Sequence, residues 1–241
     1  MRGFIDLHCH WLAGVDDGAE TQEEGVAMLR ALRELGFDTV MATPHMHPGL
    51  FDGTRAELAE AYERGRLSAA DEPGIPELGL AAEHHLDDVV FQRLLAGQGL
   101  PYPGGHAALI EFPYERLPVR AAALMFELRR KKLRPVLAHP ERYRPVWKDI
   151  EKLGPLLDGG TVLLLDVGAL AGRYGRAALR SAEQLLEAGF YYAACSDAHR
   201  LPDVEAVAQG IERLFELAGQ EEARFMLAEG PRAILDGRVD V

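Results

Sequence analysis

Histidines and carboxylates follow most of the short apolar runs in this sequence. The first run, in FIDLHCH, leads to His8 and His10, which stand two residues apart. Residues i and i+2 of an extended segment point to the same side, so both imidazoles can face one ion. Asp197 and His199 repeat this spacing in SDAH, near the other end of the chain. Because imidazole and carboxylate together suit Mn, Fe or Zn better than Ca or Mg, the spacing predicts a transition-metal site.

Short β-rich runs alternate with segments of helical periodicity along the chain. The predicted strands are 4–7, 39–43, 77–83, 108–112, 135–139, 162–167 and 191–196. The predicted helices are 21–35, 54–68, 87–96, 118–132, 148–157, 175–188 and 203–218, with a last helical stretch at 220–237. This alternation predicts an α/β fold with parallel strands, closed as a barrel or open as a doubly wound sheet. At 241 residues, one domain spanning 1–241 is the simplest organisation.

Side chains that can bind a metal stand at the ends of six of the seven predicted strands. They are His8, His10, His45, Glu83, Glu111, His139, Asp197 and His199. In a parallel barrel the carboxyl ends of the strands emerge on one face, so these residues would converge there. Without a cation, such a group would leave uncompensated charges and polar groups in one cleft. The positions therefore predict a bound metal cluster.

The overall composition excludes several classes of protein. A formal net charge of −12 argues against nucleic acid as a partner, and we interpret the basic run 129–134 as a solvated helix end. The longest apolar runs are far shorter than the roughly 20 residues that a membrane helix needs. The N-terminus does not look like a secretion signal, and two cysteines make no disulfide framework. We therefore expect a cytoplasmic protein with no membrane insertion.

Six segments together resemble the polymerase-and-histidinol-phosphatase (PHP) family of metal-dependent phosphoesterases. They are DLHCH, VDDG, TPHMHPGLF, LIEFP, PVLAHPERY and CSDAH, in this order, between about residues 4 and 200. More narrowly, they are similar to its branch of bacterial capsule and exopolysaccharide protein-tyrosine phosphatases. The resemblance implies a distorted seven-stranded (β/α)7 TIM-like barrel that holds three divalent metal ions. We expect Mn, with Fe or Zn as alternatives.

The resemblance also implies how the ligands divide among the three ions. The first set is His8, His10, Glu83 and Asp197, the second is Glu83, Glu111 and His139, and the third is Asp17, His45 and His199. Asp17 was not among the strand-end residues. Its neighbour Asp16 would then have a structural role, in a turn or in contact with one of the ligand side chains. The sequence alone leaves the two aspartates interchangeable.

Arg142, in HPERY, is the expected substrate clamp, because a guanidinium can direct two N–H donors at phosphate oxygens. The alternative for Arg142 is a surface salt bridge with Glu141. Arg200 is a candidate second clamp, although related phosphatases carry an arginine several residues beyond this motif, where RLPDVEAV has none. His47 is a third candidate substrate contact. With Arg142, the metal-binding His45 and His199 complete the expected catalytic residues.

The expected reaction is direct hydrolysis of a phosphomonoester by a water that the metals activate. The resemblance implies a phosphotyrosine protein as substrate, such as the tail of a bacterial tyrosine kinase. A phenolate with a conjugate-acid pKa of about 10 is an easy leaving group. The alternatives are a small-molecule phosphoesterase, such as a histidinol-phosphatase, and a noncatalytic metal-binding regulatory domain. A cysteine nucleophile is disfavoured, because Cys9 alternates away from the histidines and Cys195 lies inside a predicted strand.

Overall fold

The computed structural model describes residues 2–239, and within them all strands pair in parallel. One sheet has the order β1-β2-β4 and the other has the order β3-β5-β6-β7-β8-β9. The strands are β1 Phe4–Cys9, β2 Phe37–Ala42, β3 His45–Met46, β4 Glu77–Leu80, β5 Glu83–His85, β6 Ala107–Glu111, β7 Arg134–Ala138, β8 Val162–Asp166 and β9 Tyr191–Cys195. The predicted α/β fold with parallel strands is therefore confirmed.

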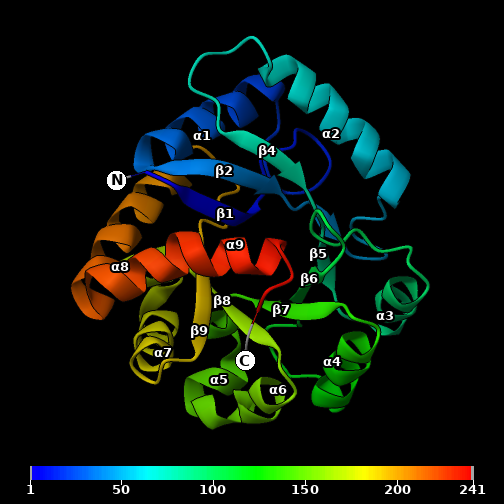
Figure 1. Cartoon of the computed structure of the whole chain (residues 1–241), viewed down its shortest axis with the longest axis vertical. Coiled ribbons are helices and arrows are strands. Elements are labelled where there is room, and N and C mark those ends of the chain that lie inside the picture. Colours follow the sequence, from blue (N-terminus) through cyan, green and yellow to red (C-terminus); the bar gives the residue numbers. More distant parts are fainter. Residues whose placement is uncertain (1, 240–241) are drawn as a thin grey trace.

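Helices surround the strands on their outer side (Figure 1). They are α1 Gln22–Leu35, α2 Arg55–Ala69, α3 Asp88–Leu95, α4 Ala121–Arg130, α5 Arg144–Lys148, α6 Gly154–Asp158, α7 Gly175–Glu187, α8 Asp203–Arg224 and α9 Gly230–Leu235. Helix α1 shows why the predicted boundaries hold. Thr21 accepts a hydrogen bond from the backbone N–H of Glu24, and Gly36 ends the helix with a φ of 110°.

The predicted helix 148–157 is wrong as a single element. The chain forms α5, a 3₁₀ turn at Ile150–Leu153 and α6 instead. Pro145 and Pro155 each stand in the first turn of an α-helix, where a residue without an N–H is tolerated. The Asp149 side chain accepts the N–H of Glu151 and starts the 3₁₀ turn between them. The two prolines therefore divide the segment into short helices.

The predicted seven-stranded closure is not confirmed. The predicted strand 77–83 is broken into β4 and β5, and a further short strand, β3, follows the predicted strand 39–43. Hydrogen bonds continue the strand pairing up to the break from each side, from Ala81 N–H to the Ala42 carbonyl (2.9 Å) next to β2 and β4, and from Glu83 N–H to the Pro44 carbonyl (3.1 Å) next to β3 and β5. Strand β1 contacts β9, but in the described residues only an isolated bridge at Cys9 pairs it with the chain after β9.

Both sheets contribute to one inner hydrophobic cluster. Small and branched side chains fill it, among them Leu7, Ala81, Leu109 and Ala193. Ile234 of α9 belongs to the same cluster, and Figure 1 shows α9 lying across the strands. This packing closes the end of the inner cluster that lies opposite the carboxyl ends of the strands.

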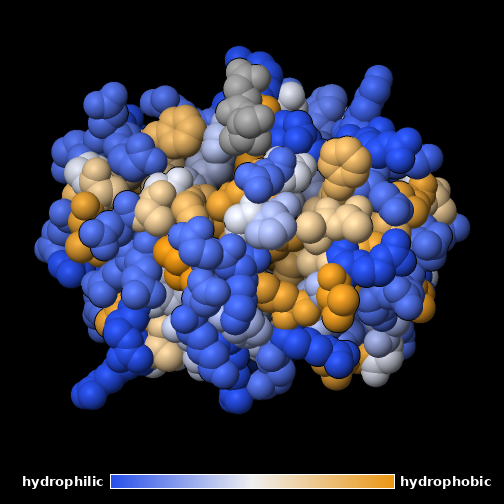
Figure 2. All heavy atoms as spheres, turned by 90° about the horizontal axis from the view of Figure 1, so that it is seen from below, coloured by the Kyte–Doolittle hydropathy of each residue, from blue (hydrophilic) through white to orange (hydrophobic). Residues whose placement is uncertain are grey.

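The outer surface seen in Figure 2 is mostly hydrophilic, with hydrophobic side chains in separate patches. Within residues 2–239, no helix has both the length and the apolar character needed to cross a bilayer.

Candidate metal centre

The structure brings together all nine residues predicted to bind metal. His8 and His10 lie at the end of β1, and Glu111 ends β6. Their donor atoms form four overlapping groups in which the atoms lie within 4.8 Å of one another. The groups are His10, Asp17, His45 and His199; His8, His10 and Asp197; His8, Glu83 and His139; and His45, Glu83 and Glu111.

The inner part of the centre contains His8, His10, Glu83 and Asp197, each at most 1% exposed. The Nε2 atom of His8 lies 3.0 Å from Nε2 of His10 and 3.2 Å from both Glu83 Oε2 and Asp197 Oδ1. The Nε2 atom of His10 lies 3.5 Å from Glu83 and 3.6 Å from Asp197. Ligand atoms about 2.1 Å from a tetrahedral metal lie about 3.4 Å apart, so this spacing fits one ion.

Glu83 stands between this inner set and the remaining ligands. Its Oε1 atom lies 3.0 Å from Nε2 of His139, which is also 3.8 Å from Glu111 Oε1. Its Oε2 atom lies 3.0 Å from Nδ1 of His45. The Glu83 carboxylate thus lies between two groups of side chains that could bind metal. A carboxylate that bridges two ions needs such a position.

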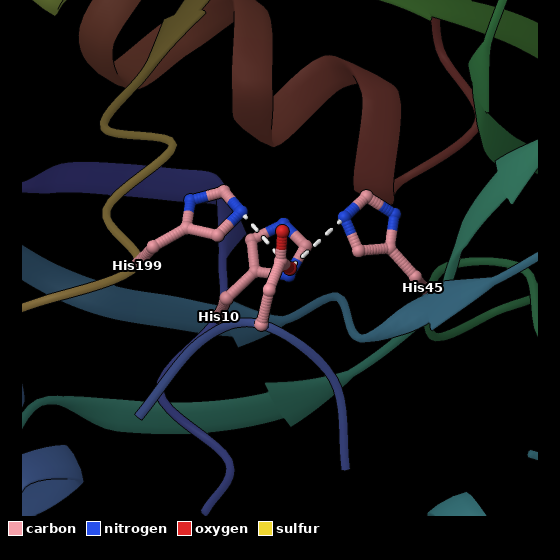
Figure 3. A group of neighbouring side chains, drawn as sticks. His10, His45 and His199 are labelled. Atoms are coloured by element: carbon pink, nitrogen blue, oxygen red, sulfur yellow. Dashed lines mark ion pairs between the residues drawn. The ribbon is translucent and has the colours of Figure 1, made fainter. Parts of the chain in front are cut away.

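The outer part of the centre is built around Asp17, whose side chain is 58% exposed. Its Oδ1 atom lies 3.4 Å from His45 Nε2 and 3.5 Å from His199 Nε2. In Figure 3 the imidazoles of His45 and His199 face this carboxylate from opposite sides, beside the ring of His10. The outer part therefore lies at the solvent side of the inner one and adjoins it through His10 and through the contact of His45 with Glu83.

The structure distinguishes the two aspartates that the sequence left interchangeable. Asp16 has a buried side chain, and its Oδ2 lies 2.8 Å from Nδ1 of His10. The same oxygen accepts the N–H of His45 (3.1 Å), and Oδ1 accepts the N–H of Gly18. A carboxylate bound to the far nitrogen of a ligand histidine fixes the orientation of its ring. Asp16 thus orients His10, while Asp17 faces the metal-binding cluster.

The charges of this cluster shift the pKa values of its histidines. Burial lowers the pKa of His8, but the charges of Asp197 and Glu83 outweigh it and raise the pKa to about 9. Burial also opposes protonation of His45, yet Glu83 and Asp17 raise its pKa to about 12. Burial and the neighbouring His199 lower the pKa of His10 to about 4. The carboxylates thus favour the protonated forms of His8 and His45, whereas His10 favours its neutral form.

Two site residues have backbone conformations that side chains rarely adopt. His139 has a φ of 35° and Asp197 a φ of 44°, both in the left-handed region. His139 directly follows β7, and Asp197 lies two residues beyond the end of β9. Such conformations cost free energy and persist where surrounding structure fixes them, as at functional sites.

Arg142 lies beside the centre and contacts its inner carboxylate. Its Nη1 atom donates to Asp197 Oδ2 over 2.5 Å, while the other oxygen of Asp197 faces the histidines. Its guanidinium carbon lies 4.9 Å from the ring centre of Tyr114 and 4.2 Å from that of Tyr174. The alternative salt bridge with Glu141 does not form. The Glu141 carboxylate is buried and accepts hydrogen bonds from Tyr191 and from the backbone of Asp166.

A cavity of about 310 Å³ opens above the metal-binding residues. Arg142 and His47 line it, as do Tyr114, Leu50 and Phe51. His47 stacks on His85, at 3.8 Å between ring centres. Arg200 does not line this cavity, and its Nη1 atom pairs with Glu20 (3.1 Å) and Glu24 (3.4 Å) instead. The structure thus places two of the three predicted substrate contacts at the cavity.

The comparison with known protein families covers almost the whole chain. The sequence model of the family described as "Capsular polysaccharide synthesis, CpsB/CapC" matches residues 4–236. The chain belongs to the CpsB/CapC family. This agrees with the resemblance to the capsule phosphatase branch.

Two curated CpsB/CapC relatives and a solved structure are similar over nearly their full length. The chain is 31% identical to the tyrosine-protein phosphatase YwqE of Bacillus subtilis, with 96% of this chain and 91% of that protein covered. It is 23% identical to the tyrosine-protein phosphatase CpsB of Streptococcus pneumoniae, with 96% and 98% covered. A crystal structure from work on YwqE and CpsB, described as unique metal-dependent tyrosine phosphatases, aligns with a TM-score of 0.90 at 30% identity, over 98% of this chain and 96% of that one.

A more distant solved structure shows the fold alone. A lactonase from Listeria monocytogenes aligns with a TM-score of 0.60 at 12% identity, over 97% of this chain and 94% of that one.

Sequence reasoning missed two polar residues around this CpsB/CapC centre, Tyr114 and Asp166. The Tyr114 hydroxyl contacts Arg142. Asp166 is fully buried at the end of β8, 3.9 Å from Arg142. Asp166 had a signal, because it stands next to the end of the sixth predicted strand, 162–167, the one strand without an assigned ligand. Tyr114 had none, because a tyrosine after a strand does not indicate a metal.

Proposed function

We propose that this chain is a metal-dependent protein-tyrosine phosphatase. The observation that carries the proposal is the convergence of nine metal-competent side chains below a cavity that Arg142 also lines. The family membership and the activity named for YwqE and CpsB support the same conclusion. The whole chain, 1–241, would act as one domain.

The proposed centre holds three divalent ions. His8, His10, Glu83 and Asp197 would hold the first, Glu83, Glu111 and His139 the second, and Asp17, His45 and His199 the third. The mixture of imidazoles and carboxylates suits Mn, with Fe and Zn as alternatives. The spacing of the inner donor atoms and the placement of Glu83 between two sets support this division.

The scaffold proposed for this centre is a distorted seven-stranded barrel. In it, β2 with β3 and β4 with β5 would each count as one broken strand. The hydrogen bonds that continue the pairing of β2 with β4 and of β3 with β5 up to these breaks support that interpretation.

The reaction would transfer the phosphoryl group from tyrosine to water. A water oxygen bonds to phosphorus, the bond from phosphorus to the phenolic oxygen breaks, and tyrosine and phosphate leave. Bound divalent ions would supply charge neutralisation and a lowered pKa of water. Arg142 would bind phosphoryl oxygens from the side of the cavity, and its pairing with Asp197 Oδ2 keeps it next to the centre.

The proposed substrate is a phosphorylated bacterial tyrosine kinase of capsule or exopolysaccharide synthesis, in the cytoplasm. The family description and the names of the relatives support the substrate class. A small phosphomonoester such as histidinol phosphate would use the same metal ligands, so substrate comparison separates the two functions. A noncatalytic metal-binding domain would hydrolyse neither.

The test is hydrolysis of a phosphotyrosine peptide and of histidinol phosphate by Mn-loaded protein, with a chelator-treated sample as control. We expect the peptide to be hydrolysed faster and the chelator to abolish activity. Preference for histidinol phosphate would favour the small-molecule function. No hydrolysis of either compound by protein with verified metal content would contradict the proposal.

A further inference from the structure

Tyr114 contacts the proposed phosphate-binding arginine and faces the cavity. It follows β6 by three positions and is 37% exposed. Nη2 of Arg142 donates a hydrogen bond of 2.6 Å to its hydroxyl oxygen, and the guanidinium lies over its ring. On the other side of its ring, Tyr114 lies 5.8 Å from His139 and 6.0 Å from Tyr143, measured between ring centres. The position of Tyr114 is thus fixed by the residues around the centre.

The hydroxyl proton of Tyr114 is available to donate a hydrogen bond. A guanidinium has donors and no acceptor, so the tyrosine oxygen must accept in its bond with Arg142. Among the described residues, no other hydrogen bond involves this hydroxyl. Its own O–H can therefore donate to an acceptor in the cavity that both residues line.

A phosphate group bound by Arg142 would still have oxygens that can accept this hydrogen bond. A phosphomonoester presents three non-bridging oxygens, and the expected second clamp, Arg200, pairs with Glu20 and Glu24 outside this cavity. Arg142 is therefore the only arginine among the described residues that line the cavity. A hydroxyl that is hydrogen bonded to Arg142 lies within reach of an oxygen that Arg142 binds.

The ring of Tyr114 belongs to the less polar part of the cavity wall. Leu50, which is 64% exposed, and Phe51 line the same cavity. The Phe51 ring stacks on His45, with 5.3 Å between ring centres and 9° between planes. Aromatic rings gain about 0.5–1.5 kcal/mol from contact with one another beyond their area burial. The wall thus favours a substrate whose phosphate is attached to a ring.

We infer that Tyr114 is a substrate-binding residue of this centre. Its hydroxyl donates to a phosphoryl oxygen next to Arg142, and its ring contacts the aromatic ring of an aryl phosphate. The inference rests on the proposed function and assigns the selectivity for aryl phosphates to this residue. Tyr174, on the other face of Arg142, does not line the cavity and takes no part in this contact.

Two variants separate the hydroxyl from the ring. Tyr114→Phe keeps the ring and removes the hydroxyl, and Tyr114→Leu removes both. Binding of phenylphosphonate and methylphosphonate, which are not hydrolysed, is measured by calorimetry on Mn-loaded protein. Tyr62→Phe, on helix α2 against Trp11, is the matched control and should leave both affinities unchanged. Metal content and thermal unfolding are recorded for every variant.

We expect Tyr114→Phe to weaken both phosphonates about tenfold to a hundredfold, the value of a hydrogen bond to a charged group. Tyr114→Leu should weaken phenylphosphonate by up to about tenfold more than methylphosphonate. Affinities within twofold of wild type in Tyr114→Phe would overturn the role of the hydroxyl. Equal losses for both ligands in Tyr114→Leu would overturn the role of the ring.

The same experiment keeps this inference distinct from the proposed function. Wild-type protein that hydrolyses phosphotyrosine while Tyr114→Phe binds normally would contradict only the inference. Wild-type protein that binds neither phosphonate would overturn the inference whatever its activity. A lack of hydrolysis together with normal phosphonate binding would contradict only the proposed phosphatase activity.

Discussion

The inner and outer parts of the metal centre differ in how the fold holds them. The proposed inner ligands His8, Glu83 and Asp197 are at most 1% exposed and lie in or next to strands of both sheets. The outer carboxylate, Asp17, is 58% exposed and lies in the loop after β1. Because strands hold side chains more rigidly than loops, we expect the inner ion to bind more tightly and the outer one to be lost first.

The largest effect is expected from removing the carboxylate that both parts share. Glu83→Gln takes a buried charge away from His8 and His45, which leaves them without their common partner. Removing one member of a buried ion pair costs about 3–5 kcal/mol, or roughly a hundredfold to several thousandfold in metal affinity. We expect dialysed protein to lose bound metal and activity together, as measured by metal analysis and phosphotyrosine hydrolysis.

The matched control for this change is Glu77→Gln. Glu77 is exposed at the first residue of β4, at the other end of the same broken strand region. It should retain metal and activity. If Glu83→Gln retained all of its metal, the two parts of the centre would not depend on Glu83 as a shared carboxylate.

Arg142→Ala is expected to lower activity without removing metal. Arg142 contacts the inner part only through Asp197 Oδ2, and Oδ1 of Asp197 still faces His8. Loss of a donor that stabilises transition-state charge typically lowers kcat by about 10²–10³. Metal analysis of the purified variant should match wild type, while kcat/KM for a phosphotyrosine peptide falls by that factor. Loss of metal in this variant would show that Arg142 stabilises the centre itself.

Asp16→Ala is expected to weaken metal binding at the inner part, although Asp16 precedes the outer ligand Asp17 in sequence. Asp16 holds Nδ1 of His10, and loss of such a partner typically costs about 10–100-fold in metal affinity. Competition with a metal-binding dye measures the loss. Asp17→Ala is the comparison and should release the outer ion alone, so that the two variants differ in metal content after dialysis.

The pH dependence of metal binding should also separate the two histidines of the inner part. His8, with its pKa raised to about 9, carries a proton at pH 7 that the metal must displace. His10, with its pKa lowered to about 4, carries none. Each displaced proton raises apparent affinity about tenfold per pH unit, so affinity should rise about tenfold from pH 6 to 7 and again from 7 to 8. A hundredfold rise per unit would mean that a second histidine, His45 or His10, also releases a proton when metal binds.

The sequence predicted which nine side chains converge because the signal for their position is local. An apolar run that stops abruptly at His or Glu marks the carboxyl end of a strand, as at Glu111 and His139. In a parallel α/β fold that position alone brings the residue to the shared face. The choice between Asp16 and Asp17 came from the family resemblance, since both stand in one loop and only the contacts with His10 and His45 separate them.

Other features depend on contacts that the sequence does not reveal. The predicted strand 77–83 is interrupted at Ala81 and Ala82, and strand pairing resumes beyond Pro44 as β3, where no strand was predicted. The position of Arg142 between Tyr114 and Tyr174 joins residues after three different strands. Arg200 follows the ligand His199 directly, but its side chain is held by glutamates at the start of α1. Adjacency in sequence therefore indicated a role that the packing does not support.

The smallest effect is expected from Arg200→Ala. Arg200 is paired with Glu20, whose side chain is 75% exposed, and such surface pairs contribute about 0–1 kcal/mol to stability. We therefore expect less than about a twofold change in kcat/KM and normal metal content, because removing one exposed pair leaves the ligands in place. A tenfold rise in KM with kcat unchanged would mean that Arg200 leaves its glutamates to bind substrate. Arg200, on the solvent side of the centre, would then bind substrate directly, and phosphate binding would depend on Arg200 as well as on Arg142.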